Sequence, residues 1–332
     1  MSKKVLTGIT PSGIPHIGNY IGAIKPAIEF SKQEDYDCFY FIADYHSLIK
    51  LHDPKLRKQY TREIATTWLA LGLDPKENLF YRQSCIPEIL ELTWILSNVT
   101  AKGLLNRAHA YKAQLDINKS ANNSDIDSGI YMGLYNYPVL MAADILIFNP
   151  DLVPVGKDQI QHIEIARDIA QRFNHIYGEV FKLPKAIVDQ NTQTIPGLDG
   201  RKMSKSYNNT IPIFSEEKSL RKLIMKIQTN SQLPEEPKDT ANCTLFAIYK
   251  TIATEAEIST MRKRYTSGIG WGDMKKILFE KMADVLKKPR ENYKQLLENP
   301  DYVETVLQDG ALKARELSRP MLEKVRKAIG IQ

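Results

Sequence analysis

The N-terminal half of the chain alternates short apolar segments with segments of helical periodicity, and this alternation restricts the fold more than any other feature. The patterns of buried strands occur at Val5–Ile9, Cys38–Ala43, Leu79–Tyr81 and Val153–Val155. Helical patterns lie between and after them, at residues 19–30, 56–71 and 158–173. Strands that alternate with helices form parallel sheets whose faces the helices cover. We therefore expect an α/β fold.

The pattern changes along the chain in a way that indicates more than one domain. After Pro212 it is mostly helical to the end, so we place a boundary there and expect domains at 1–212 and 213–332. A mostly helical stretch at about 86–130 interrupts the first domain, and the polar Asn118–Ser128 within it is predicted to be a mobile loop. A chain of 332 residues is long enough to bury the cores that this organisation requires.

Composition excludes several classes of protein. The three cysteines, Cys38, Cys85 and Cys243, form no Cys-x-x-Cys pair, so we expect no structural zinc, no iron–sulfur cluster and no other bound metal site. No apolar run reaches membrane-spanning length, and the N-terminus does not resemble a signal peptide, so we expect a cytoplasmic protein without membrane contact. The net charge of +6 fits a polyanionic partner, but it equally fits proteins that never bind nucleic acid.

The segment Thr7–Tyr20, TGITPSGIPHIGNY, runs from a strand through small residues into a helix. Small residues let a ligand approach the backbone, and a helix N-terminus offers N–H groups to phosphate. His16 adds a donor there, and we expect it to lie outside the core. The alternative is a tight turn with an incidental histidine. Neither a P-loop nor a dinucleotide fingerprint is present.

The segment Gly197–Asn209, GLDGRKMSKSYNN, contains two lysines that flank two serines within 202–206. Glycines before them and asparagines after them predict a mobile loop. Two ammonium groups on such a loop can follow the negative charge that builds on a leaving pyrophosphate. The alternative is a solvated basic loop, which is the usual role of such a run.

Together, Pro-x-x-x-His-Ile-Gly-Asn and KMSKS resemble the two signatures of class I aminoacyl-tRNA synthetases. The resemblance implies a Rossmann-like parallel-sheet catalytic domain with an inserted helical segment, which would supply much of a homodimer interface. It also implies a helical C-terminal domain that faces the tRNA anticodon.

A third segment is similar to the tryptophanyl-tRNA synthetase family of bacterial type. It reads YNYPVLMAADILIF at 135–148 and continues through VPVGKDQ at 153–159, QHIE at 161–164 and RDIAQRFN at 167–174. Asp144 lies in this apolar run, where a carboxylate needs a donor partner. An indole N–H is such a donor. Without the resemblance, a helix cap or a pair with a basic core residue would explain Asp144 as well.

The resemblance implies a role for each residue of a candidate site. The groups that act on phosphate are His16, Lys202 and Lys205. The groups around ATP are Thr10, Pro11, Ser12, Gly18, Asn19, Gly156, Lys157, Asp158, Ile195, Lys202, Met203, Ser204, Lys205 and Ser206, and those around tryptophan are Asp144, Tyr137, Met141, Gln159 and His46. Asp158 is also predicted to cap the N-terminus of the helix that follows it.

Two departures from the family pattern limit this assignment. Ser47 follows His46 where alanine is common, and the stretch Ala110–Leu115 lacks the lysine-rich character that many members have, which leaves Lys112 as a weak candidate for reaching the phosphates. The basic helices at 218–226 and 313–327 are explained by solvated faces as well as by RNA contact.

The implied reaction joins L-tryptophan to tRNA(Trp). Tryptophan would attack the α-phosphate of ATP, which enters with Mg²⁺, to give tryptophanyl-adenylate and pyrophosphate, and tRNA would then accept the acyl group. Three alternatives remain: a tyrosyl-tRNA synthetase, a small-molecule nucleotidyltransferase and a non-catalytic RNA-binding relative.

Overall fold

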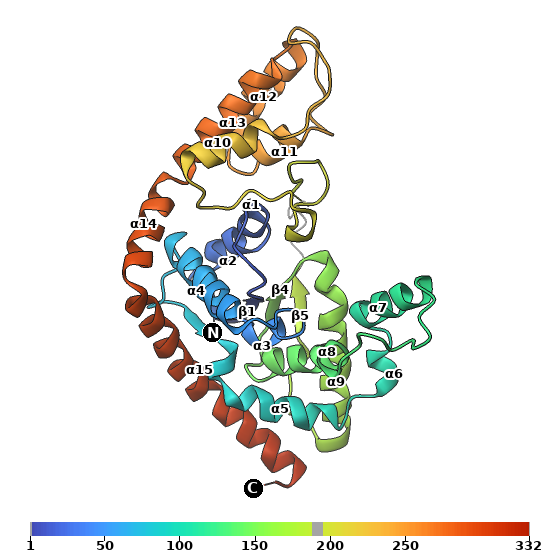
Figure 1. The fold of residues 1–332 in the computed structure, drawn as a ribbon. Helices are drawn as coiled ribbons and strands as arrows, with labels where there is room; N and C mark the ends of the chain where they lie inside the picture. Colours follow the sequence, from blue (N-terminus) through green and yellow to red (C-terminus); the bar gives the residue numbers. More distant parts are fainter. Residues whose placement is uncertain (1, 188–194, 332) are drawn as a thin grey trace.

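A single parallel sheet forms the centre of the molecule (Figure 1). The computed structural model describes residues 2–187 and 195–331. The strands are β1 (Lys3–Ile9), β2 (Tyr36–Ile42), β3 (Leu79–Arg82), β4 (Leu152–Pro154) and β5 (Lys185–Ile187). Their order is β3-β2-β1-β4-β5, and every pairing is parallel. The predicted α/β fold is therefore confirmed, and β5 is a strand that the sequence did not predict.

Helices cover both faces of this sheet. Those of the N-terminal part are α1 (Ile17–Asn19), α2 (Lys25–Phe30), α3 (Asp44–Ser47), α4 (Pro54–Ala70), α5 (Pro87–Ser97), α6 (Lys102–Leu105), α7 (His109–Ser120), α8 (Met132–Leu146) and α9 (Ile160–Tyr177). A π-helical turn, Tyr20–Ile24, joins α1 to α2. The expected helix at 19–30 is thus a continuous but irregular helical stretch.

Alternate side chains of the strands feed two hydrophobic cores, because successive residues of a strand point to opposite faces. Val5, Tyr40 and Phe80 point into the core that contains Trp68 of α4. Leu6 belongs to the other core, which α5, α8 and α9 cover. Both faces are therefore sealed, and a ligand can reach the sheet only at its ends.

The C-terminal part is helical, as predicted, and its helices lie in two places (Figure 1). They are α10 (Glu217–Met225), α11 (Thr244–Tyr249), α12 (Glu255–Ser267), α13 (Trp271–Val285), α14 (Lys287–Glu298) and α15 (Pro300–Ile329). The group α10–α13 forms a cap at the top of the view, whereas α15 runs down beside the sheet. The division at residue 212 stays a prediction.

The contact between α15 and the sheet is very close. A Cβ atom added to Gly310 of α15 would lie 1.9 Å from the carbonyl oxygen of Phe80 in β3. Only glycine fits there, and the ion pair between Arg82 and Glu304 ties the same two elements. The last long helix is therefore an integral support of the outer strand.

The expected loop at 118–128 is more ordered than its composition suggests. Asn118 lies in the last turn of α7 and is buried. Its amide donates to the carbonyl oxygens of Ile126 and Ser128, at 2.8 and 2.7 Å. The side chain of one buried asparagine thus holds the turn that follows α7. The predicted loop began at Asn118, which was wrong, because residues 118–120 belong to α7.

Candidate active site

A large cavity lies at the carboxyl ends of β1 and β4. In the sheet, β2 and β3 lie on one side of β1, whereas β4 and β5 lie on the other. The strand order therefore reverses between β1 and β4, which is called the switch point. Ligands of open parallel sheets bind at such a point. The cavity has a volume of about 970 Å³. Of the residues predicted from the sequence, it is lined by Thr10, Ser12, His46, Tyr137, Met141, Asp144, Gly156 and Gln159.

Asp144 of α8 is completely buried at the bottom of this cavity. The amide of Gln83 donates to both of its oxygens, at 2.8 and 2.9 Å, and Nε2 of His46 lies 2.9 Å from Oδ2. Burial raises the pKa of the Asp144 carboxyl, while the bonds from His46 and Gln83 act against that rise. A carboxylate can accept about four hydrogen bonds, and these two donor groups make three contacts, which leaves room for about one more.

Gln83 is a site residue that sequence reasoning missed. It is fully buried, and its Oε1 accepts from the backbone N–H of Tyr45 at 3.0 Å. Gln83 therefore connects Asp144 to α3, the short helix that carries His46. Next to it, the backbone N–H of Ser84 donates to Asp44 at 2.9 Å. The available signal was position: Gln83 follows directly after β3, at the edge where the functional groups gather.

A second polar chain lies beside the first, since the ring centroids of Tyr137 and His46 are 6.3 Å apart. The hydroxyl of Tyr137 lies 2.6 Å from Nε2 of His162, and Nδ1 of His162 lies 2.8 Å from Oε1 of Gln159. Burial lowers the pKa of His162, so the neutral ring donates from Nδ1 to Gln159 and accepts from Tyr137. The prediction that Asp158 caps the helix was wrong: it lies within a 3₁₀ turn and accepts from the side chain of Gln159 at 3.0 Å.

His16 is buried, so the expectation that it lies outside the core was wrong. It is the N-cap of α1: Nδ1 accepts from the N–H of Asn19 at 3.3 Å, and the Asn19 side chain accepts from the His16 N–H at 3.1 Å. Burial, assisted by the nearby charge of Lys205, lowers the pKa of His16 to about 4. The ring is therefore neutral at physiological pH, and because Nδ1 accepts, Nε2 carries the proton that can be donated.

The 202–206 loop lies directly on the His16 turn. Met203 is buried, and its sulfur accepts from the N–H of Gly18 at 3.3 Å. Gly13 has a φ of 135°, and a Cβ there would lie 2.9 Å from Cδ of Lys205, so the lysine stem crosses the space that a side chain would fill. Burial lowers the pKa of Lys205 to about 8. The two predicted signatures are thus brought together, as the resemblance implies.

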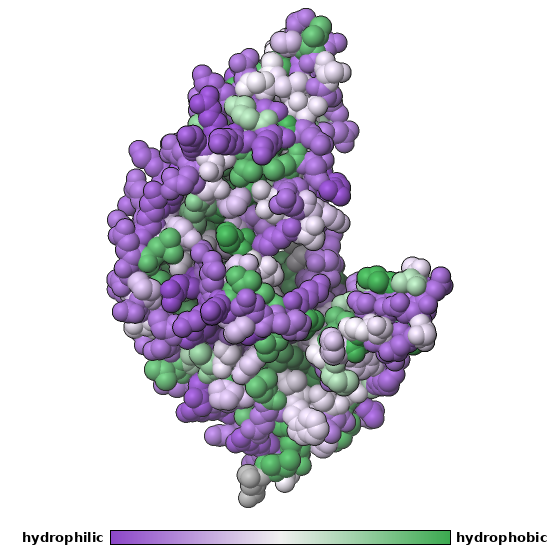
Figure 2. Space-filling model, in the orientation of Figure 1, coloured by the Kyte–Doolittle hydropathy of each residue, from purple (hydrophilic) through white to green (hydrophobic). Residues whose placement is uncertain are grey.

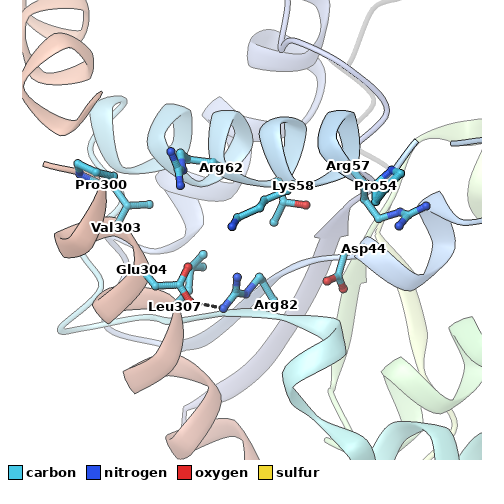
Figure 3. Close-up of a pocket in the computed structure, with 11 residues that line it drawn as sticks. Asp44, Pro54, Arg57, Lys58, Arg62, Arg82, Pro300, Val303, Glu304 and Leu307 are labelled. Atoms are coloured by element: carbon cyan, nitrogen blue, oxygen red, sulfur yellow. Dashed lines mark hydrogen bonds and ion pairs between the residues drawn. The ribbon is translucent and has the colours of Figure 1, made fainter. Parts of the chain in front are cut away.

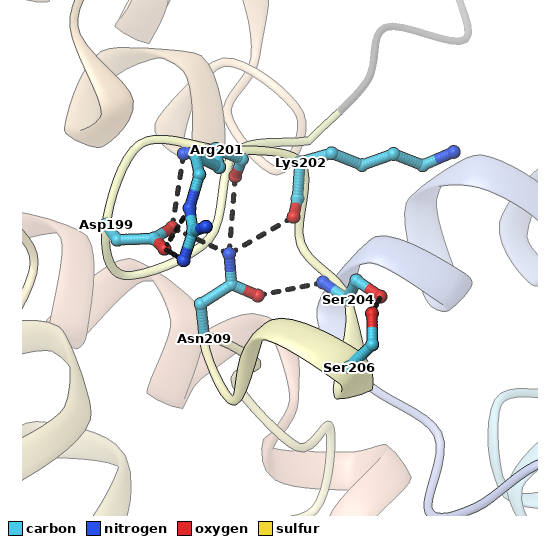
Figure 4. Close-up of polar contacts among 6 residues, drawn as sticks. All are labelled: Asp199, Arg201, Lys202, Ser204, Ser206 and Asn209. Carbon is cyan, nitrogen blue, oxygen red and sulfur yellow. Dashed lines mark hydrogen bonds and ion pairs between the residues drawn. The ribbon is translucent and has the colours of Figure 1, made fainter. Parts of the chain in front are cut away.

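The side chain of Asn209 makes hydrogen bonds that hold the 202–206 loop (Figure 4). The asparagines in this segment had instead suggested a mobile loop. Asn209 is buried, and its Oδ1 accepts from the N–H of Ser204 at 2.8 Å. Its amide donates to Asp199 at 2.6 Å and to the carbonyl oxygen of Lys202 at 3.1 Å. The backbone at the base of the loop is therefore fixed, while the Lys202 side chain extends into solvent.

Other predicted residues do not line the cavity. They are Pro11, His16, Gly18, Asn19, Lys157, Asp158, Ile195 and residues 202–206. Ile195 is buried, and its carbonyl accepts from the N–H of Met203 at 2.8 Å. Lys112 is exposed on α7, where Ala110 faces the cavity instead. Within the described residues, no group of three His, Cys, Asp or Glu side chains could hold a metal ion.

Comparison with known proteins places these features in a family. Residues 2–287 match the family described as tRNA synthetases class I (W and Y). The chain is 53% identical to a tryptophan–tRNA ligase of Neisseria meningitidis, over 100% of this chain and 99% of that protein. A tryptophan–tRNA ligase of Pseudomonas aeruginosa is 52% identical, over 100% of this chain and 75% of that protein.

Solved structures agree with this relationship. The tryptophanyl-tRNA synthetase of Campylobacter jejuni, in complex with ADP and tryptophan, superposes with a TM-score of 0.87 at 45% identity. That match covers 99% of this chain and 100% of the other. A tyrosyl-tRNA synthetase of Aeropyrum pernix shares the fold, with a TM-score of 0.69 at 20% identity. The chain therefore belongs to the class I aminoacyl-tRNA synthetases and, within them, to the bacterial tryptophanyl-tRNA synthetase family.

Proposed function

We propose that this chain is a tryptophan–tRNA ligase, which activates L-tryptophan with ATP and transfers it to tRNA(Trp). One observation carries the proposal: the switch-point cavity holds a buried carboxylate, Asp144, with one acceptor position left for a donor. The relative from Campylobacter jejuni, which holds tryptophan and ADP, supports the assignment of the cavity.

Tryptophan selection would depend on this free acceptor position. The indole N–H is a donor only, so it complements a carboxylate that keeps one lone pair toward the cavity. Met141 offers a polarisable sulfur to the indole face, and the chain formed by Tyr137, His162 and Gln159 would orient the amino end. A phenol hydroxyl would not require a pure acceptor, which argues against tyrosine.

Activation would proceed by positioning and charge stabilisation, because a phosphoryl centre needs no protein nucleophile. Tryptophan attacks the α-phosphate of Mg-ATP, and pyrophosphate leaves. His16 would donate from Nε2, and Lys202 and Lys205 would follow the charge on the leaving group. Mg²⁺ enters as part of the nucleotide substrate.

The nucleotide would lie between two walls of backbone. One wall consists of Thr10, Pro11, Ser12, Gly18 and Asn19, and the other of Gly156, Lys157, Asp158, Ile195 and residues 202–206. Asp158 is free to face the ribose because it does not cap the helix. Because ATP and tRNA are cytoplasmic substrates, we assign the reaction to the cytoplasm. Within the described residues, no helix has the length and apolar character to span a membrane.

Pyrophosphate exchange with each of the twenty amino acids tests the activity directly. We expect exchange with tryptophan alone, followed by charging of tRNA(Trp). Exchange with tyrosine would support the rival synthetase. Exchange without tRNA charging would point to a small-molecule nucleotidyltransferase, and the absence of exchange to a non-catalytic RNA-binding relative.

A homodimer would use the apolar surface of the inserted segment. Trp94 is 72% exposed, and Leu90 and Ile117 are exposed as well, as are Tyr131 and Met132 directly after the segment. Figure 2 shows apolar surface on the projecting arm that contains α7. Such residues lose contact with water when they pack against a second copy. Sedimentation should show a dimer that Trp94→Glu dissociates, whereas a monomeric wild-type protein would contradict this arrangement.

A further inference from the structure

A second, smaller cavity lies between α4, the end of β3 and α15 (Figure 3). Its volume is about 250 Å³, and it does not share a residue with the larger cavity. Its lining residues are Asp44, Pro54, Arg57, Lys58, Thr61, Arg62, Arg82, Pro300, Val303, Glu304 and Leu307. Four of them are cations and two are carboxylates, so the cavity carries an excess of positive charge.

The two carboxylates do not neutralise the cations of α4. Asp44 accepts from the backbone and hydroxyl of Ser84, and Glu304 pairs with Arg82 and accepts from Gln308. Within the described residues, no carboxylate lies within 4 Å of the Arg57, Lys58 or Arg62 side chains. Three neighbouring cations on one helix repel one another, and an anion would remove that repulsion.

The cavity also has hydrogen-bond donors in excess. Among the described residues, the Nε–H groups of Arg57 and Arg82 are buried without a partner, although other nitrogens of these side chains donate to the Leu51 carbonyl oxygen and to Glu304. Thr61 contributes a hydroxyl from the same helix face. Guanidinium groups and hydroxyls around a small volume suit a tetrahedral oxyanion, because a guanidinium presents two parallel donors to it.

We propose that this cavity binds a phosphate group. The phosphate can belong to the backbone of the tRNA or to a free phosphate compound, and the chemistry of recognition is the same. Binding of a tRNA phosphate rests on the proposed function, whereas binding of a free phosphate compound does not. The site lies behind the larger cavity, since α3 places Asp44 in one cavity and His46 and Ser47 in the other.

The test uses the double variant Lys58→Gln, Arg62→Gln. Both side chains are exposed, and neither belongs to the catalytic machinery, so pyrophosphate exchange should stay at the wild-type rate. The charge-matched control is Lys287→Gln, Lys288→Gln on α14, outside the cavity. Lys205→Gln removes the cation that could hold phosphate in the larger site.

In the first arm, the melting temperature is measured with inorganic phosphate and, as a control, with chloride at the same ionic strength. A site for free phosphate predicts a rise that disappears in Lys58→Gln, Arg62→Gln and persists in Lys205→Gln. In the second arm, the KM for tRNA is measured. Contact with RNA predicts that the KM for tRNA rises about tenfold in Lys58→Gln, Arg62→Gln but not in Lys287→Gln, Lys288→Gln. The binding of tRNA to the first variant should also depend less on salt.

A positive result in either arm supports the phosphate site and identifies its source. The proposal is overturned if the tRNA KM of the double variant equals that of Lys287→Gln, Lys288→Gln while phosphate either has no effect or acts only through Lys205. If the wild-type protein shows no pyrophosphate exchange, that result counts against the proposed function. The melting temperatures would still show whether the smaller cavity binds phosphate.

Discussion

The two parts of the proposed active site are built differently. In the part proposed to bind tryptophan, Asp144 and Gln83 are fully buried and joined by hydrogen bonds. In the part proposed to act on phosphate, the 202–206 loop contacts the His16 turn through the Met203 sulfur and the stem of Lys205. A group that must discriminate between amino acids is fixed before binding, because its geometry sets the specificity. Groups proposed to follow a moving charge are placed on a loop whose backbone is held by Asn209, while the Lys202 side chain stays exposed.

The largest expected effect is at the loop. Lys202→Ala and Lys205→Ala should each lower the rate of activation by roughly 10²–10³, because each removes a charge donor aimed at the transition state. The KM for tryptophan should change little, since the part proposed to bind tryptophan is untouched. Single-turnover pyrophosphate exchange measures both quantities. Wild-type rates in both variants would refute the assigned role and erase the contrast between the two parts.

In the part proposed to bind tryptophan, Asp144→Ala should weaken tryptophan use by about 1.5–3 kcal/mol, the range for a hydrogen bond to a charged group. A tryptophan analogue with sulfur in place of the indole nitrogen should be rejected by the wild-type enzyme and rejected less by the variant. Exchange rates for both substrates on both enzymes complete a double-mutant cycle. Additive losses would show that Asp144 serves the fold and that tryptophan is selected elsewhere.

The pH profile should reflect the loop alone. The proposed role of Lys205 requires its charged form, and its pKa of about 8 means that this form is lost as the pH rises through 8. The kcat/KM for ATP should therefore be about tenfold lower at pH 9 than at pH 7. His16, with a pKa of about 4, contributes no change in this range. In Lys205→Arg the decline should move above pH 10, and an unchanged decline would exclude Lys205 as its cause.

A smaller effect is expected behind Asp144. Gln83→Leu removes one of the two donor groups, and with it two of the three contacts to the carboxylate, and should raise the KM for tryptophan by about five- to tenfold, with the KM for ATP unchanged. Ser84→Ala is the matched control, because its side chain bonds Asp44 instead. Equal effects of the two substitutions on tryptophan KM would mean that Gln83 only supports the turn.

The smallest effect separates the two roles of His16. His16→Ala removes the cap of α1 and should lower the free energy of unfolding by about 1 kcal/mol, whereas His16→Asn keeps a capping side chain. Both variants should slow activation, because neither retains the Nε2–H donor. Urea unfolding and exchange rates provide the two readouts. Normal activation in His16→Asn would assign the histidine to the cap alone.

The sequence predicted the parts of the site that family motifs reveal. Asp144 and the 202–206 loop were singled out by the resemblance, because the local patterns alone also allowed a pair with a basic residue and a solvated loop. The structure shows that the Asp144 carboxylate does have partners, His46 and Gln83. Gln83 could not be predicted, because a glutamine after a strand resembles any loop residue and its partners lie 38 and 61 residues away along the chain. The buried state of His16 was missed for a similar reason, since the loop that covers it comes from a distant segment.

The same limit applies to the fold. Four strands follow from apolar runs, but β5 contains only three residues, Lys185–Ile187, one of them a lysine, and is defined by its pairing with β4. Asn118 and Asn209 have the composition of loop residues and the burial of core residues. Their amides satisfy backbone groups of turns, and that requirement becomes visible only when the chain is folded.

The fit of Gly310 against Phe80 has a kinetic consequence. The elements that it joins are far apart along the chain: Arg82 and Glu304, which tie the same contact, are separated by 222 positions. Contacts of such long range form late, because the cost of closing the intervening loop comes before the gain. Until α15 arrives, β3 is an outer strand with an unsupported flank, and open strand edges promote aggregation. We therefore expect that docking of α15 protects the open edge of β3 during folding.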